Sequence, residues 1–144
     1  IALYDFPCKL RIVGKLTDSQ RMILELYNIS YECVSNLSDD EILLEYVNCD
    51  LVNFPSLYEG FGMPIIEGQS VGRPVLTSNI SPTKEVAGNA AVLVNPTCPD
   101  SIRNGYEELL KNSEEFIVKG FNNVKRFALS RITQEYFEIY NKML

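Results

Sequence analysis

Short apolar runs alternate along this chain with longer segments in which apolar residues recur at helical spacing. The short runs predict strands at 10–14, 31–34, 51–54, 74–78 and 91–94. Apolar and polar residues do not alternate within them, which is typical of parallel strands buried on both faces. The pattern therefore predicts an α/β fold, a Rossmann-like doubly wound parallel sheet flanked by helices.

Helices are expected between and after these strands. Segment 18–29 follows a Thr-Asp cap and carries apolar residues at helical spacing. A second helix should begin at Ser38, because the three acids after it lie where the helix dipole favours negative charge. A third should follow a glycine-rich loop and end before 72–74, a Gly-Arg-Pro stop. From Pro99 onward the pattern predicts helix in two or three pieces.

Length and composition fit one globular domain spanning 1–144, with 46% hydrophobic and 22% charged residues. The net charge of −6 argues against a nucleic-acid partner, since such proteins usually carry a basic face. The locally basic run 119–131 is expected to be one solvated helix face.

The chain has no histidine, which excludes Ser-His-Asp and Cys-His catalysis here and removes the commonest metal ligand. The four cysteines are far apart and form no CxxC pair, so a reduced, cytoplasmic compartment is the simplest expectation.

The segment 55–74, PSLYEGFGMPIIEGQSVGRP, follows a predicted strand and opens a helix, where ligands bind in open parallel sheets. Gly60 and Gly62 let backbone amides approach a ligand, and Pro64 suits a first helical turn. The free amides at that helix end favour an anion such as a diphosphate. Taken alone, such a loop is as often structural as functional.

Two acids flank the loop, Glu59 before it and Glu67 one turn into the helix. Neither suits a phosphate, because both are anions. A carboxylate can instead accept hydrogen bonds from two neighbouring hydroxyls, as in a ribose or a hexose. Spacing alone leaves equally open that Glu67 is a surface residue and Glu59 a loop acid.

This segment resembles the signature of a large family of retaining glycosyltransferases of GT-B fold, family 4 or group 1, which includes many bacterial mannosyl- and glucosyltransferases. Further matches at 12–14, 77–79, 85–88 and 94–96 extend the resemblance over roughly 10–102. It implies the C-terminal half of a GT-B enzyme. The matching signature residues are Pro55, Ser56, Glu59, Gly60, Phe61, Gly62, Pro64, Glu67, Gly72, Pro74 and Val75.

The resemblance also implies roles for individual residues. Glu59 is expected to contact the donor hexose as the catalytic residue, and Glu67 to bind the ribose diol. Lys15 would add positive charge beside the donor, although a solvated loop lysine is the simpler interpretation. The sugar hydroxyls and diphosphate would lie at Gly60, Phe61, Gly62, Met63 and Pro64, and the nucleobase at Ser35, Asn36, Leu37, Gly14 and Lys15.

The implied reaction is metal-independent transfer of a hexose from a UDP- or GDP-sugar to an acceptor hydroxyl, with retention, in bacterial polysaccharide or glycolipid synthesis. A carbohydrate or lipid-linked acceptor would bind the other lobe, through which the enzyme could also attach peripherally to the inner face of the membrane. The family's Arg-x-x-x-x-Lys element, which neutralises the diphosphate, has no match here. We therefore expect a domain truncated on its N-terminal side, without its first strand and acceptor lobe, and inactive alone.

Two other functions compete with this one. A non-catalytic nucleotide-sugar-binding or regulatory module would keep the same fold, although the presence of both acids argues against decay of the site. A flavodoxin-like signalling domain would need a phosphoacceptor Asp after an early strand, whereas the predicted strands end at Gly14, Val34 and Phe54.

Overall fold

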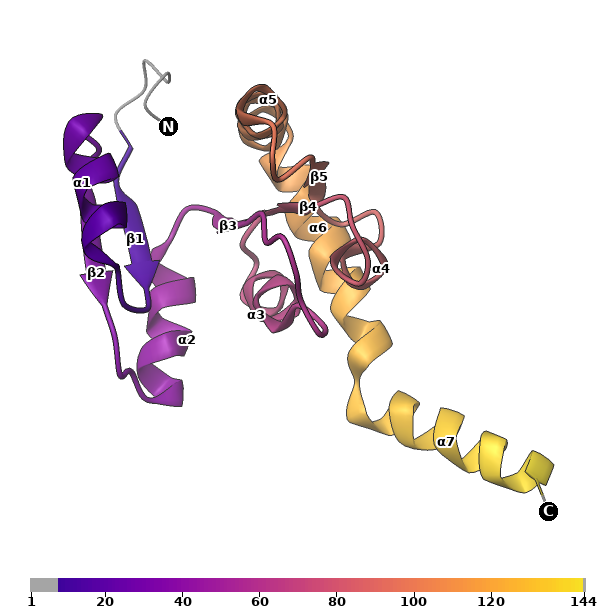
Figure 1. The fold of residues 1–144 in the computed structure, drawn as a ribbon. Helices are drawn as coiled ribbons and strands as arrows, with labels where there is room; N and C mark the ends of the chain where they lie inside the picture. The colour runs from indigo at the N-terminus through magenta and orange to yellow at the C-terminus, as the bar shows by residue number, and fades with distance from the viewer. Residues whose placement is uncertain (1–7, 144) are drawn as a thin grey trace. The chain divides into compact units, whose positions relative to one another are not determined.

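The computed structural model describes residues 8–143 and divides the chain into two compact units, 1–49 and 50–144 (Figure 1). Unit 1 contains two strands and two helices. Its elements are β1 (Leu10–Val13), α1 (Asp18–Leu26), β2 (Tyr31–Val34) and α2 (Asp39–Asn48). The strands run parallel, with Leu10 opposite Tyr31 and Val13 opposite Val34, so α1 is the crossover of a βαβ unit.

Both helices of unit 1 begin at capping boxes. The Thr17 hydroxyl accepts from the Gln20 amide while the Gln20 side chain accepts from the Thr17 amide. Ser38 and Glu41 repeat this reciprocal arrangement at α2. Each box satisfies two amides that a helix start leaves without partners, which fixes where α1 and α2 begin.

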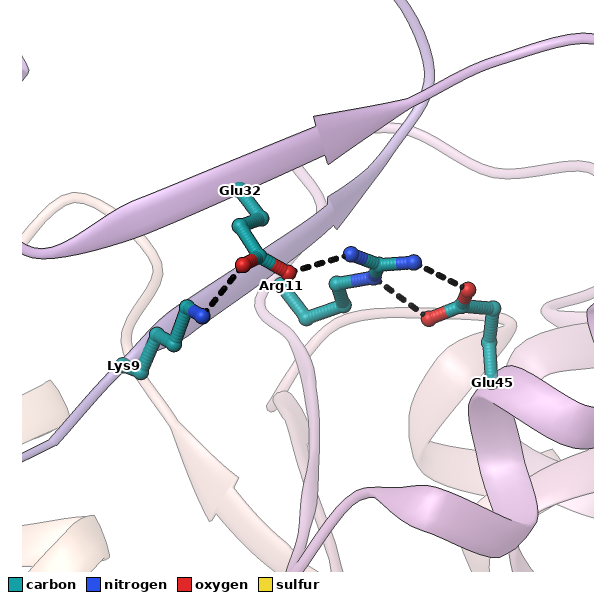
Figure 2. Close-up of polar contacts among 4 residues, drawn as sticks. All are labelled: Lys9, Arg11, Glu32 and Glu45. Carbon is teal, nitrogen blue, oxygen red and sulfur yellow. Dashed lines mark hydrogen bonds and ion pairs between the residues drawn. The ribbon is translucent and has the colours of Figure 1, made fainter.

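Charged side chains tie the sheet of unit 1 to α2 (Figure 2). The Arg11 guanidinium donates from Nε and Nη2 to the two carboxylate oxygens of Glu45, at 2.7 and 2.6 Å. Its Nη1 donates to Glu32 at 2.5 Å, and Lys9 pairs with the other oxygen of Glu32. The hydrogen bonds from Arg11 hold the pKa of Glu45 below its usual range, and those from Lys9 and then Arg11 do the same for Glu32.

Unit 2 contains a three-stranded parallel sheet in the order β3-β4-β5, with Val52 opposite Val75 and Leu76 opposite Val92. A helix follows each strand, because parallel strands need a crossover connection and this is usually helical. The elements are β3 (Val52–Phe54), α3 (Met63–Ser70), β4 (Val75–Ser78), α4 (Thr83–Ala87), β5 (Val92–Val94), α5 (Pro99–Lys111), α6 (Ser113–Val124), the 3₁₀ turn η1 (Lys125–Phe127) and α7 (Leu129–Met143).

The apolar core of unit 2 lies between this sheet and α5 and α6. Strand β4 is buried along its whole length, as expected for a central parallel strand. Gly105 lets α5 approach closely, because a Cβ there would lie 2.5 Å from Val94 Cγ1. The buried members of the core cluster are Leu76, Val92, Val94, Leu109 and Phe116.

A buried polar network joins α3 to α4 and α6. Gln69 donates from Nε2 to the Ala90 carbonyl at 3.0 Å and accepts from Asn123 Nδ2 at 2.8 Å. Asn123 also donates to the Val86 carbonyl and accepts from Arg126, at 2.9 and 2.7 Å. Because each amide group in the network has a partner, burial of Gln69 and Asn123 carries no desolvation penalty for an unpaired group.

The α/β fold of parallel strands flanked by helices is confirmed, and each predicted strand is found within about one residue of its expected bounds. The strands pair as two sheets, one in each unit. The first helix is shorter than expected: α1 ends at Leu26, and Asn28 adopts a left-handed conformation. The short helix α4 was not expected.

The basic run 119–131 is not one helix face, as the sequence suggested. It spans the end of α6, η1 and the start of α7, and Arg126 donates to Asn123 and to the Glu85 carbonyl. The interruption arises because Ala128 is extended and breaks the helix. All four cysteines are free thiols. Within 8–143 no helix combines the length and apolarity needed to cross a bilayer.

Candidate functional site

The loop that follows β3 is anchored by two hydroxyl groups of β4. Thr77 Oγ1 donates to the Phe54 carbonyl at 2.9 Å, and Ser78 Oγ donates to the Ser56 carbonyl at 2.5 Å. Both hydroxyl residues are fully buried. The polar end of this otherwise apolar strand thus sets the path of the loop toward Glu59.

Within the loop, Ser56 is hydrogen-bonded through its backbone and its side chain. Its amide donates to the Phe54 carbonyl at 2.9 Å, which closes a tight turn. Its hydroxyl lies 2.7 Å from Glu59 Oε1 and 3.1 Å from the Tyr58 carbonyl. Glu59 is partly buried, so this hydrogen bond orients a carboxylate that is still accessible.

The two loop glycines serve different purposes. Gly62 has φ of +103° and is the N-cap of α3, and a Cβ there would lie 3.1 Å from Ile65 Cδ1. The fold itself therefore requires glycine at this position. A Cβ on Gly60 would meet no heavy atom within 4 Å, so packing within the protein does not explain that glycine.

Helix α3 begins without a side-chain cap. Pro64 has no amide hydrogen to donate, and the Ile65 amide bonds to the Gly62 carbonyl at 3.0 Å. Met63 is therefore the first-turn residue whose amide remains to meet a ligand, together with the amides of the preceding glycine loop. Such a helix end carries the positive end of the helix dipole and favours an anion.

Glu67 lies on the same helix, one turn after Met63, and is partly buried. The neighbouring Gly68 packs against β3, where a Cβ would lie 2.6 Å from Val52 Cγ2. Close packing of α3 on the sheet thus fixes the helix that carries Glu67. The first of the two acids is held by a loop and the second by a docked helix.

Phe61 connects the glycine loop to the C-terminal helices. Its ring meets that of Phe127 edge-on, with centroids 5.7 Å apart and planes at 89°. Arg126 lies over the other ring of this pair, 5.1 Å from the Phe127 centroid. Because Arg126 also binds the buried Asn123, the aromatic contact links the loop to the polar network.

The five residues predicted to surround a nucleobase lie in unit 1. Gly14 and Lys15 follow β1, and the Gly14 amide donates to the Val34 carbonyl at 2.7 Å. The loop 35–37 follows β2, with Asn36 in a left-handed conformation at φ +59°. Lys15 is exposed. The structure therefore gathers Gly14, Lys15, Ser35, Asn36 and Leu37 at the carboxyl ends of β1 and β2.

The remaining predicted residues, 59–64 and Glu67, lie together in unit 2 at the end of β3 and the start of α3. Three residues that the sequence reasoning left without a role also shape this region: Thr77, Ser78 and Phe127. The signal available for the first two was a pair of hydroxyl residues ending an apolar strand. Among residues 8–143 no three Cys, Asp or Glu side chains gather as a metal-binding group.

Comparison with known proteins identifies relatives of this chain. A family model described as glycosyl transferases group 1 matches residues 5–120. The O-antigen chain mannosyltransferase B of Escherichia coli is 30% identical over 105 residues, covering 71% of this chain and 28% of that protein. The MMP alpha-(1->4)-mannosyltransferase of Mycolicibacterium hassiacum is 29% identical over 148 residues, covering 94% of this chain and 36% of that one.

Solved structures share the fold. The crystal structure of HepE from Anabaena, in complex with UDP and glucose, superposes with a TM-score of 0.78 at 19% identity. The match covers 98% of this chain and 43% of HepE. This likeness extends to the fold alone, and the chain spans less than half the length of each of these relatives.

Proposed function

This chain belongs to the group 1 glycosyl transferases, and from that membership we propose that it is the donor-binding half of a hexosyltransferase. The whole enzyme would transfer a hexose from a nucleoside diphosphate to an acceptor hydroxyl. Mannose is the first hexose to test, because the similar proteins from Escherichia coli and Mycolicibacterium hassiacum are named mannosyltransferases.

The observation that carries this proposal is the uncapped start of α3 beside a fixed carboxylate. The left-handed Gly62 turns the chain into a helix whose Met63 amide is left for a ligand, and Ser56 holds Glu59 in the same loop. We assign the diphosphate to the amides of 60–63 and the hexose to Glu59. The open space at Gly60, which packing within the protein does not require, suits a ligand lying against the backbone.

The rest of the donor is assigned by chemistry and by family. Glu67 accepts hydrogen bonds from the ribose diol, as a carboxylate beside two hydroxyls can. The family resemblance assigns the nucleobase to the loops that follow β1 and β2 in unit 1, including Asn36 and Lys15. No metal is needed in this scheme, because amide dipoles and cations from the Arg-x-x-x-x-Lys element of the whole enzyme would balance the diphosphate.

In the transfer, the bond between the anomeric carbon and the diphosphate oxygen breaks, and a bond to the acceptor oxygen forms on the same face of the sugar. The proton of the acceptor hydroxyl passes to the leaving diphosphate. Negative charge grows on the leaving diphosphate while the sugar becomes oxocarbenium-like. Amides fixed in advance stabilise that charge more in the transition state than in the ground state. Retention of configuration is part of this proposal, as are a carbohydrate or lipid-linked acceptor and action at the cytoplasmic side of a membrane.

Turnover of the full-length protein tests the proposal. GDP-mannose and UDP-glucose would be supplied with an acceptor, and the products followed by NMR that resolves the two anomers. We expect transfer with retention, lowered by about 100-fold or more in Glu59→Gln, because removal of a group that stabilises the transition state costs roughly that factor. Glu107→Gln, an exposed acid on α5, is the matched control.

Two results would contradict parts of this assignment. Full turnover in Glu59→Gln would remove Glu59 from the reaction, and inversion of the anomer would exclude same-face displacement. Binding of a nucleotide sugar without any transfer would instead identify the chain as a non-catalytic binding module of the same fold.

A further inference from the structure

Ser56 connects Glu59 to the interior of unit 2, because it is hydrogen-bonded both to the buried Ser78 and to the Glu59 carboxylate. Its hydroxyl has one hydrogen and two acceptors within reach, the Glu59 carboxylate at 2.7 Å and the Tyr58 carbonyl at 3.1 Å. The contact with the charged group is the shorter, as expected when the acceptor is ionised. The hydroxyl therefore acts mainly on the carboxylate.

The position of Ser56 is itself fixed from within the fold. Its carbonyl accepts from the buried Ser78 hydroxyl at 2.5 Å. The buried Thr83 hydroxyl in turn lies 2.9 Å from the Ser78 carbonyl and 2.8 Å from the Ile80 carbonyl, so it is shared between the two. A series of hydroxyl-to-carbonyl contacts thus runs from α4 through the end of β4 to the loop. Rigid elements position functional side chains more accurately than a free loop does.

At Phe54 and Ser56 the path of the loop is set by hydrogen bonds other than those of the Ser56 hydroxyl, whose longer contact is with the Tyr58 carbonyl at 3.1 Å. The Phe54 carbonyl already accepts from Thr77 Oγ1 and from the Ser56 amide, and the Ser56 carbonyl from Ser78. These bonds involve only backbone atoms of the loop and side chains of β4. The remaining polar group, the hydroxyl, is directed at Glu59.

We propose that Ser56 is a positioning residue for the donor hexose: its hydroxyl holds one oxygen of Glu59, which leaves the other oxygen to accept from a sugar hydroxyl. The inference rests on the proposed function, since it requires Glu59 to contact the hexose. It predicts a selective effect. Loss of the hydroxyl should weaken the contribution of the hexose to binding and leave the affinity for the nucleoside diphosphate unchanged.

The test is calorimetric titration of the full-length protein with GDP-mannose and GDP, and with UDP-glucose and UDP. In Ser56→Ala the Kd of the accepted nucleotide sugar should rise by about tenfold, as for loss of one charge-assisted hydrogen bond, while the Kd of the matching nucleoside diphosphate stays within about twofold. Ser56→Thr keeps the hydroxyl and should restore most of the affinity. Ser130→Ala removes an exposed hydroxyl on α7 and serves as control.

A double-mutant cycle with Glu59→Ala separates positioning from a direct contact. If Ser56 acts through Glu59, adding Ser56→Ala to Glu59→Ala should change the Kd of the nucleotide sugar by less than about twofold. Additive losses would overturn the positioning role, as would equal losses for the sugar conjugate and the bare diphosphate.

The possible failures are distinct. Wild-type protein that binds neither GDP-mannose nor UDP-glucose would overturn the proposed function, and the positioning role with it. If wild-type protein binds one of them and Ser56→Ala binds it with the same Kd, the positioning role alone would be overturned. Ser56→Thr keeps the proposal testable if the alanine variant folds poorly, because loss of affinity with the hydroxyl still present would contradict it.

Discussion

The two units of this chain are held together in different ways. Unit 2 has a continuous apolar core around β4, together with the buried network of Gln69 and Asn123. Among the described residues of unit 1, Leu24 alone is buried, and the sheet is tied to α2 by the ion pairs of Arg11. Apolar burial contributes far more free energy than exposed ion pairs do.

This difference bears directly on the proposed donor site. The residues assigned to the hexose, diphosphate and ribose lie on the well-packed unit, at the end of β3 and on α3. Those assigned to the nucleobase follow two strands held by backbone hydrogen bonds and helix caps. We therefore expect substitutions in the two units to differ in magnitude, and the following predictions measure that difference.

The largest effect should come from the core of unit 2. Leu76→Ala should lower the free energy of unfolding by about 3 kcal/mol, because it removes buried methyl groups and leaves a cavity next to Val92 and Leu109. Urea unfolding followed by circular dichroism would measure it.

Leu26→Ala in unit 1 is the matched control, since Leu26 is 74% exposed. We expect a change within about 0.5 kcal/mol, as for most surface substitutions. Equal losses for the two variants would contradict the contrast between the units.

The buried network should give the second largest effect. Asn123→Ala leaves Gln69 Oε1, the Val86 carbonyl and Arg126 without their partner, so unfolding should become easier by about 2 kcal/mol. Asn122→Ala alters its exposed neighbour on the same helix and should be nearly neutral. Thermal unfolding of the two variants compares them, and equal midpoints would show that the network adds nothing.

The strands and the start of α3 were predictable because their signals are local. Apolar runs mark all five strands, and a Gly-x-Gly-x-Pro sequence marks the turn into a helix. Helix α4 escaped prediction because its five residues make little more than one turn, too short for periodicity to register. After Pro99, helix in two or three pieces was expected, and the described residues form α5, α6 and α7. The position of the break at Ala128 was not predicted, since one extended residue does not alter the pattern around it.

The contacts that organise the site were not predictable in the same way. The family resemblance indicated Glu59, but the hydrogen bonds from Ser78 to the Ser56 carbonyl and from Ser56 to Glu59 depend on how β3 and β4 align. The edge-on contact between Phe61 and Phe127 joins residues far apart in the sequence. Such contacts follow from tertiary packing, which local patterns do not encode.

Substitution of the two loop glycines should have different effects, on stability at Gly62 and on ligand binding at Gly60. Gly62→Ala should cost about 1–2 kcal/mol, because its φ of +103° is strained for any residue with a Cβ. Gly60→Ala should leave stability unchanged, because its Cβ meets open space, yet weaken nucleotide-sugar binding if a ligand lies there. Urea unfolding and calorimetric titration of both variants test this, and unaltered binding by Gly60→Ala would contradict the assigned ligand position.

The smallest effect should come from the ion pairs of unit 1. The Arg11 hydrogen bonds lower the pKa of Glu45. This pair therefore contributes its full stabilisation at pH values above 4.5, the ordinary pKa of a glutamate, and loses it as the pH falls through the lowered pKa. Glu45→Gln should therefore flatten the decline in stability below pH 4.5. In high salt, where exposed charges are screened, the free energy of unfolding of the variant should differ little from that of the wild type. A large loss in high salt would contradict the weak role given to these pairs.

Donor binding tests the central claim most directly. Saturation-transfer NMR would compare UDP, GDP, UDP-glucose and GDP-mannose on the full-length protein, with Glu67→Ala as the variant. We predict that one nucleotide and its hexose conjugate bind and that Glu67→Ala weakens both, because the ribose is common to the two ligands. Absence of binding by all four ligands, or binding that is unchanged in Glu67→Ala, would contradict the proposed donor site.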